Sequence, residues 1–427
     1  MMKASELEIS SKDFAVDGSN ANGVARQREV MRNIQRRLVA HLGAGGTTDM
    51  ADDCMVISSR IYADQELFEI EQKKLFETLP LVAGLSCDIP ERGDVMTFDE
   101  VGPPIIIVRT ASGGVRAFLN RCSHRAARLV GACSHQSRIT CPFHGWTFDL
   151  EGKLIGLPVK EGFAGLERQN LNLVRVPVRE WNGVIFIRAR PGDEEIDIES
   201  YLGSMAPELA QLGLGRMVPI KKQRVEIGAN WKFALDTFFE AYHFATLHAK
   251  SIVKETVCNV MVHDEFGPHQ RVMVPQLFWK KWIGRPEEEW ERVPYQGIHL
   301  LFPNTIMLVV NLDFLDEGGG SASDRQIFGF WRMFPGGSPG KGYSQMATYR
   351  PDSQKTSEQM AEYVMTTDQI INILSTEDFS LCRDGQRNME TSGKEDAVII
   401  GRNEGAVQSI HEHLAAYIAD KPKAVRC

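Results

Sequence analysis

The segment at 121–148 reads RCSHRAARLVGACSHQSRITCPFHGWTF, and it requires two loops of the folded chain to meet. Cys122 and His124 form a CxH pair. After sixteen intervening residues, Cys141 and His144 form a CxxH pair. Thiolate and imidazole side chains repeated at such short spacing are typical of a metal site. The chain has eight cysteines among 427 residues and groups them only here, so a disulfide scaffold is not expected.

The spacing favours iron over zinc. Paired zinc ligands are usually two to four residues apart, which a CxH pair does not satisfy. In a Rieske [2Fe–2S] cluster two cysteines hold one iron and two histidines hold the other, so each loop supplies one of each. The predicted cluster ligands are Cys122, His124, Cys141 and His144. We expect Trp146 and Phe148 to shield the cluster from water, and a zinc site is the alternative.

A second CSH, formed by Cys133 and His135, competes for this assignment. Only five residues separate His135 from Cys141, too few for a hairpin that brings two loops together from opposite sides. We therefore predict that this pair binds no metal. The remaining cysteines are expected to be buried or incidental thiols: Cys54, Cys87, Cys258, Cys382 and Cys427.

A second candidate metal site lies in the segment NWKFALDTFFEAYHFATLH, which the sequence predicts to be helical. Asp236, Glu240 and His243 are four and then three residues apart, and thus share one helical face. His248 follows His243 by five residues, about 140° round a straight helix, so both can reach one metal only where the helix bulges or ends between them. Two histidines with one carboxylate form the facial triad of non-haem Fe(II) oxygenases, and the carboxylate must come from elsewhere.

The two patterns in this order, about 100 residues apart, resemble the catalytic α subunit of Rieske non-haem iron oxygenases, the ring-hydroxylating dioxygenase family. The resemblance covers roughly residues 80–400. Beside the cysteine–histidine pairs, it rests on NWK at 230–232 and YHxxxxH at 242–248. It implies that His243 and His248 bind a mononuclear iron.

The resemblance also implies a third iron ligand in the later segment TEDFSLCRDGQR. We predict Asp378, with Glu377 and Asp384 as the alternatives. In the first cluster loop, His124 is followed by Arg-Ala-Ala, where the family often has Arg and then Gly at the position of Ala126. This difference could alter the loop.

Glu240 and Asp236 are the candidate catalytic acids. Ring dioxygenases of the family usually have Asp at the position of Glu240, where it bridges a Rieske histidine of a neighbouring subunit to an iron-ligand histidine. Family members that act on carnitine, betaine and similar quaternary amines can have Glu. A Glu can still accept a hydrogen bond from each imidazole, so the departure bears on the substrate rather than on the bridge.

We expect an α+β chain: a small all-β Rieske domain and a larger catalytic domain with an antiparallel sheet flanked by helices. The predicted division is a helical N-terminal extension at 1–78, the Rieske iron–sulfur domain at 79–190 and the mononuclear iron domain at 191–427. The expected helices are 31–42, 230–248, 357–389 and one after Asn403. The expected strands include 104–108, 184–187, 270–274, 299–309, 326–334 and 345–349.

Net charge is −8, which argues against nucleic acid as a partner. No apolar run is long enough for a membrane span and no secretory signal is apparent, so a cytoplasmic location is expected. The chain lacks a dinucleotide-binding GxGxxG and a ferredoxin-type CxxxxCxxC, so electrons must come from a separate reductase that uses NAD(P)H, with or without a ferredoxin. By resemblance, three copies form a head-to-tail ring.

The leading functional hypothesis is a terminal oxygenase that hydroxylates, dihydroxylates or oxidatively dealkylates a small aromatic or N-methylated compound. The alternatives are a quaternary-amine monooxygenase of the carnitine or betaine type, a Rieske electron-transfer protein without catalysis, and a zinc-stabilised binding module. Four aromatic residues could line a pocket, although core packing is favoured for them: Phe238, Phe239, Phe244 and Phe302.

Overall fold

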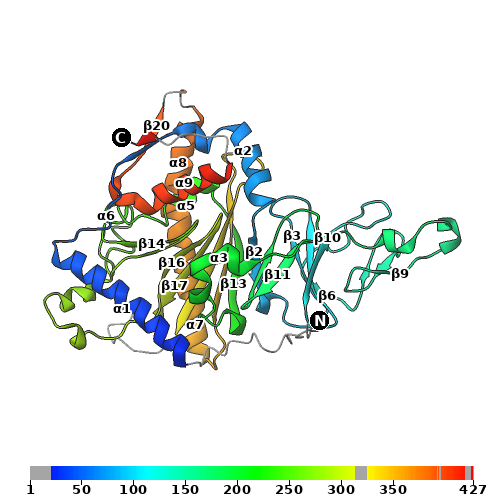
Figure 1. Ribbon diagram of the computed structural model, residues 1–427, viewed down its shortest axis with the longest axis horizontal. Coiled ribbons are helices and arrows are strands. Elements are labelled where there is room, and N and C mark those ends of the chain that lie inside the picture. The colour runs from blue at the N-terminus through cyan, green and yellow to red at the C-terminus, as the bar shows by residue number, and fades with distance from the viewer. Residues whose placement is uncertain (1–20, 313–324, 392, 394–395, 419–424, 427) are drawn as a thin grey trace, which may run out of the picture.

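The structure is a computed structural model that describes residues 21–312, 325–391, 393, 396–418 and 425–426. Figure 1 shows a broad body built on one large sheet, with a smaller β domain that extends to the right past β9 (Leu154–Gly156). Among the described helices, none has the length and apolarity needed to cross a bilayer. The α+β class predicted from the sequence is confirmed.

The first described element is helix α1 (Ala21–Gly43). Its side chains at Met31, Ile34, Leu38 and Leu42 are buried, as their three- and four-residue spacing predicts. The helix ends at Gly43, and Gly45 and Gly46 follow with positive φ angles of 88° and 85°. Farther on, β1 (Met55–Ser58), α2 (Gln65–Glu71) and the π-helical turn η2 (Gln72–Phe76) lead to the β domain.

The small β domain contains three antiparallel sheets, of strand orders β10-β5-β4-β3-β6, β11-β12-β2 and β7-β8-β9. The second cluster loop connects β7 and β8, and the first meets it through His124 and His144. The remaining strands are β2 (Leu81–Leu85), β3 (Asp94–Phe98), β4 (Ile105–Arg109), β5 (Val115–Leu119), β6 (Ser134–His135), β7 (Ile139–Thr140), β8 (Thr147–Phe148), β10 (Arg175–Val176), β11 (Val178–Trp181) and β12 (Val184–Ile187).

The larger body is built on a seven-stranded antiparallel sheet of order β13-β19-β18-β17-β16-β15-β14. Its strands are β13 (Met217–Glu226), β14 (Val262–Phe266), β15 (His269–Met273), β16 (Gly297–Leu301), β17 (Thr305–Asn311), β18 (Gln326–Phe334) and β19 (Tyr343–Pro351). The prediction of one strand over 299–309 is wrong. Pro303 lies between β16 and β17, and the chain reverses there because proline offers no N–H to a ladder.

Helices cover this sheet (Figure 1). The prediction of one helix over 230–248 is wrong: α5 (Trp231–Asp236) ends early, and the single turn α6 (Phe244–Leu247) follows a loop. The long helix predicted at 357–389 is present as α7 (Ser357–Ile373), a π-helical turn η11 (Leu374–Asp378) and α8 (Phe379–Glu390). Of the other helices, α3 (Ile198–Leu202) and α4 (Ala206–Leu209) precede the sheet, and α9 (Gly405–Ile418) follows β20 (Ala397–Ile400); β21 is Val425–Arg426.

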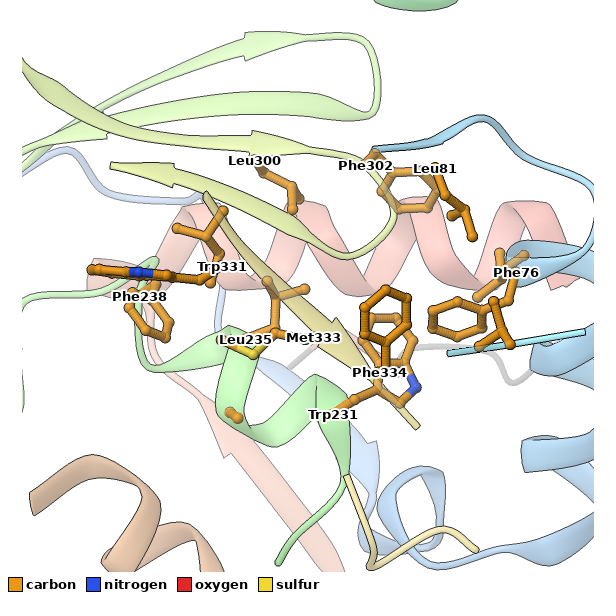
Figure 2. Packing of buried hydrophobic residues seen from close by; sticks show 14 of the residues in the cluster. Phe76, Leu81, Trp231, Leu235, Phe238, Leu300, Phe302, Trp331, Met333 and Phe334 are labelled. Atoms are coloured by element: carbon orange, nitrogen blue, oxygen red, sulfur yellow. The ribbon is translucent and has the colours of Figure 1, made fainter. Parts of the chain in front are cut away.

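A shared apolar core fixes α5 against the sheet. Figure 2 shows Trp231 and Leu235 of α5 beside Phe334 and Trp331 of β18, with Phe76 of η2 packed against the same group. Trp231 and Phe76 meet edge to face with ring centroids 5.1 Å apart. The chain that leaves α5 towards α6 therefore starts from a rigid point.

Candidate metal centres

The turn α6 holds one histidine at each of its ends. His243 immediately precedes this turn and His248 immediately follows it, and their Nε2 atoms lie 3.2 Å apart. Asp378, the last residue of η11, brings its Oδ1 to 3.5 Å from the Nε2 of His243 and 3.3 Å from that of His248. The sequence predicts that the helix bulges or ends between the two histidines. In the structure, α5 ends at Asp236, before both of them.

The loop before α6 replaces helical bonds with a side-chain acceptor. The carboxylate of Glu240 accepts the backbone N–H of Tyr242 at 2.5 Å and of His243 at 3.1 Å. Those two N–H groups are thus satisfied without an α-helix. The arrangement turns His243 towards Asp378.

The three side chains fit a metal ion. The two Nε2 atoms face each other at 3.2 Å, where at most one can donate to the other, and Asp378 Oδ2 is buried without a partner. Within the part of the chain that the structure describes, His243, His248 and Asp378 are the group of ligand atoms that could hold one ion, all within 4.8 Å of one another. The donor set of two imidazoles and one carboxylate suits ferrous iron with open positions for other ligands.

The surroundings of the triad favour positive charge. Burial lowers the pKa of His243, but its hydrogen bonds to Asp378 and Glu240 outweigh that effect and raise the pKa to about 9. Burial raises the pKa of Asp378, but hydrogen bonds from His243 and His248 lower it overall. The same negative field that would hold a proton on an imidazole also attracts a metal cation.

Each triad histidine has a carboxylate at its other ring nitrogen. Glu240 Oε1 lies against His243 Nδ1, and Glu377 Oε2 lies 2.8 Å from His248 Nδ1. Ser251 donates its hydroxyl to the same Glu377 oxygen at 2.8 Å. Such contacts place the proton on Nδ1 and leave Nε2 free to bind a metal. Glu377 is thus not the iron ligand that the sequence offered as an alternative to Asp378. The sequence signal for its orienting role is its position next to Asp378.

The π-helical turn η11 allows Glu377 and Asp378 to reach opposite sides of one imidazole. Two hydroxyls bond back to carbonyls in this turn: Ser375 Oγ donates to Ile371 O at 2.6 Å, and Thr376 Oγ donates to Asn372 O at 2.7 Å. These bonds occupy carbonyls at the point where the helix widens. Single π turns of this kind are frequent at functional sites.

Two other acids named from the sequence lie outside the triad. Asp236 does not share a face with His243, because α5 ends at that residue; its carboxylate accepts a hydrogen bond from Tyr62 Oη at 2.6 Å and lies 3.1 Å from His411 Nε2. Asp236 therefore joins α5 to the segments at Tyr62 and α9. Asp384 is exposed and pairs with Arg387 at 3.2 Å, so it does not contact the triad.

The second set of predicted ligands meets in the small β domain. Cys122 and Cys141 are buried, and the Nδ1 atoms of His124 and His144 lie 3.2 Å apart. The pKa of His124 is lowered, first by burial and then by the positive field of His144, which favours the neutral imidazole that a metal needs. Two thiols and two facing imidazoles fit the Rieske cluster.

Trp146 shields this site as predicted. Its ring is buried and stacks on His124 with centroids 5.0 Å apart and an interplanar angle of 6°. Phe148 is also buried. Cys133 and His135 are both exposed, Cys133 just before β6 and His135 on it, where His135 Nδ1 pairs with Asp94 at 2.9 Å.

The first cluster loop closes on itself through backbone bonds. Cys122 N donates to Ala127 O and Ala126 N donates to Cys122 O, at 2.8 Å and 3.0 Å. The turn forces Ala126 to a φ of 55°, in the left-handed region that glycine prefers. This is the residue for which the family often has glycine.

A pocket of about 460 Å³ includes the triad. Phe238 and Phe244 line it, while Phe239 and Phe302 are buried and do not. Phe238 also belongs to the apolar core and Phe244 packs against it, so these two residues both contact the core and line the pocket.

Two family models match the chain. The Rieske [2Fe-2S] domain matches residues 80–173, and the catalytic domain of the ring hydroxylating alpha subunit matches residues 214–420. The first match contains both cluster loops, and the second contains the triad.

Curated relatives match part of the chain. Over 206 residues it is 31% identical to the glycine betaine monooxygenase oxygenase subunit of Pseudomonas aeruginosa, with 46% of each chain covered. It is also 31% identical to the biphenyl dioxygenase subunit alpha of Metapseudomonas furukawaii, with 45% of this chain and 44% of that one covered. The matched region thus spans under half the length of these relatives.

Solved structures share the fold over most of the chain. The quaternary ammonium Rieske monooxygenase CntA with L-carnitine has a TM-score of 0.68 at 20% identity, over 86% of this chain and 96% of that one. Naphthalene 1,2-dioxygenase from Rhodococcus sp. bound to indole has a TM-score of 0.65 at 18% identity, over 92% and 99%.

Proposed function

Because this chain belongs to the family of Rieske-type ring-hydroxylating oxygenase α subunits, we propose that it is the terminal oxygenase of a multicomponent system. It uses O₂ and electrons from a separate reductase to hydroxylate, dihydroxylate or oxidatively dealkylate a small organic substrate. The observation that carries this proposal is the convergence of His243, His248 and Asp378 beside a pocket of about 460 Å³. An electron-transfer protein would need neither.

Two sets of side chains would hold the metals. Cys122, Cys141, His124 and His144 would hold the cluster, and His243, His248 and Asp378 would hold the mononuclear iron. When bound, the cluster supplies electrons one at a time and the mononuclear iron binds and activates O₂.

The chain's own residues prepare the site for this chemistry. Glu240 and Glu377 hold the Nδ1 protons of His243 and His248, and this fixes both rings with Nε2 towards the ion. The apolar lining excludes water, and Phe238 and Phe244 give the substrate a flat surface to contact.

Partners follow from what the chain lacks. A reductase that uses NAD(P)H, possibly through a ferredoxin, would supply the electrons. The cluster loops and the triad lie far apart in one chain, since β9 is in the small domain and α6 and α8 are in the larger body (Figure 1). A head-to-tail homotrimer, in which the Rieske domain of one subunit meets the catalytic domain of the next, would bring them together. The three-part division of the chain and its cytoplasmic location stay predictions.

Glu240 favours a second candidate, a quaternary-amine monooxygenase. Its carboxylate occupies the position where ring dioxygenases usually have Asp, and the oxygenase subunit of glycine betaine monooxygenase is among the relatives. Glu240→Ala should keep the cluster but weaken the binding of mononuclear iron, because His243 loses the acceptor at its Nδ1. In the iron-loaded variant, reductant oxidation should be uncoupled from product formation. Unchanged coupling would contradict a bridging role for Glu240.

The test of the proposed function separates the two centres. His243→Ala should lose turnover and mononuclear iron but keep the brown colour and Rieske absorption. Cys122→Ser should lose the colour, whereas Cys133→Ser, the matched control in the second CSH, should keep it. Full turnover in His243→Ala, or a protein that binds only zinc, would refute the proposal.

A further inference from the structure

The ionisable lining of the triad pocket is one-sided. Its acids are Glu240, Glu255 and Asp378, and none of the lining residues that the structure describes is a lysine or an arginine. Glu240 and Asp378 are engaged by the two triad imidazoles. Glu255 is the remaining acid of the lining, and its carboxylate does not contact either imidazole of the triad.

Backbone bonds hold Glu255 at the pocket. Glu255 O accepts the N–H of Leu277 at 2.8 Å, and Val257 N donates to Pro275 O at 2.9 Å. Burial alone raises the pKa of Glu255, and no base among the described residues forms an ion pair with it. Glu255 is exposed at the pocket, and a carboxylate without a counter-charge there attracts a cation and repels an anion.

Aromatic rings in the same pocket also suit a cation. Phe238 and Trp331 line it with ring centroids 5.4 Å apart, and Figure 2 shows them side by side. The indole Nε1 of Trp331 is buried without a partner. It lies close to Gly329 of the same strand, since a Cβ added to that glycine would be 3.2 Å from it. A single neutral donor there would not balance the charge of a carboxylate.

We propose that Glu255 determines specificity and that the pocket takes a small, largely apolar molecule that carries one amine cation. This inference rests on the proposed function and narrows its substrate class. It separates amines from aromatic acids, which carry no cation for Glu255 to attract.

Four benzyl compounds of similar size test the charge preference. N,N-dimethylbenzylamine is protonated at neutral pH, isobutylbenzene is its uncharged isostere, phenylacetate is the acid, and benzyltrimethylammonium is the permanent cation. Their dissociation constants would be measured by anaerobic equilibrium dialysis against the full chain with its metals and without reductase. Both cations should bind about tenfold or more tightly than isobutylbenzene, and phenylacetate should bind most weakly. The two cations together distinguish a protonated amine from a quaternary one.

Variants of Glu255 connect the preference to this residue. Glu255→Gln should weaken the two cations about tenfold and leave isobutylbenzene unchanged. Glu255→Lys should reverse the order of amine and phenylacetate. Glu289→Gln, an exposed acid outside the pocket, is the control and should behave as the parent chain. The cluster absorption checks that each variant is folded.

Three results would overturn the proposal: phenylacetate that binds as tightly as the amine, equal weakening of amine and isobutylbenzene in Glu255→Gln, or no measurable binding of either cation. Since the assay involves no turnover, it is independent of the oxygenase activity. Selective amine binding by a chain that never consumes O₂ would refute the proposed function and leave this inference intact.

Discussion

Glu377 is the residue on which the orientation of His248 depends. Glu377 lies 2.8 Å from His248 Nδ1 and is not itself one of the three predicted metal ligands. We predict that Glu377→Ala lowers the affinity for mononuclear iron about 10- to 100-fold, because the imidazole loses the acceptor that fixes its tautomer. Iron per protein after dialysis against a graded chelator measures this.

The exposed acid Asp384 provides the control for that experiment. Asp384→Ala should keep its iron, since Asp384 contacts Arg387 and not the triad. Glu377→Gln, which keeps an acceptor oxygen, should recover part of the lost affinity. Equal iron retention in Glu377→Ala and the parent chain would show that the contact has no orienting role.

Ala126 has a left-handed backbone conformation that is unfavourable for alanine and favourable for glycine. A residue with a Cβ at φ 55° is strained by about 1–2 kcal/mol, partly offset by the greater chain entropy of glycine when unfolded. Ala126→Gly should therefore stabilise the first cluster loop by about 1 kcal/mol, measured as slower loss of cluster absorbance on heating. Ala127→Gly, at the next position, should give no gain.

At the scale of elements, a buried ion pair joins the segment before the β domain to α5. Lys232 Nζ donates to Glu71 Oε1 at 2.6 Å and Trp231 Nε1 donates to Glu71 Oε2 at 3.2 Å, with both charged side chains at most 3% exposed. Glu71→Ala would leave the ammonium buried and unpaired, and we expect a loss of about 3–5 kcal/mol in unfolding free energy. Chemical denaturation followed by fluorescence measures it.

Glu66 on the exposed side of α2 is the matched control. Glu66→Ala should change the unfolding free energy by less than about 0.5 kcal/mol. If the two variants were equally stable, α2 would not be part of the folded unit that positions α5.

The sequence predicted elements best where local chemistry decided them. The expected strands at Val184–Ile187 and Gln326–Phe334 have the same bounds in the structure, because turn-forming residues bracket each apolar run. The break after Asp236 was missed, since Phe238, Phe239 and Ala241 continue an apolar helical pattern. Tertiary contacts decide that segment: the Asp236 carboxylate bonds to Tyr62, and the Glu240 carboxylate accepts the N–H groups that a helix would have used.

For the metal sites too, the sequence predicted what local patterns encode and missed the contacts between distant residues. Spacing and resemblance named the side chains that meet at the triad and at the cluster loops. The pairing of His248 with Glu377 and of Asp236 with His411 joins residues more than 100 positions apart, which no local pattern encodes.

For the whole molecule, the head-to-tail ring predicts that two inactive chains can complement each other. His243→Ala keeps its cluster loops and Cys122→Ser keeps its triad. Co-expressed in one ring, they should restore a measurable fraction of turnover, because the Rieske domain of one subunit would serve the catalytic domain of the next. Oxygen uptake coupled to product formation measures it.

The controls for this experiment are each variant alone and a ring that combines the parent chain with the double variant Cys122→Ser/His243→Ala. Each variant alone should be inactive. Mixed rings with no activity, at a size that confirms three subunits, would mean that the two centres cooperate within one chain.

The position of the predicted third iron ligand, Asp378, depends on the number of residues in the π-helical turn Leu374–Asp378. A π turn holds one residue more than an α-helical turn, so the loss of a single residue between Ile373 and Asp378 would rotate everything that follows by about 100°. Both Asp378 and Glu377 would then lose their contacts with the imidazole of His248. This short stretch can accept changes in its exposed side chains, but a change in its length would abolish the centre.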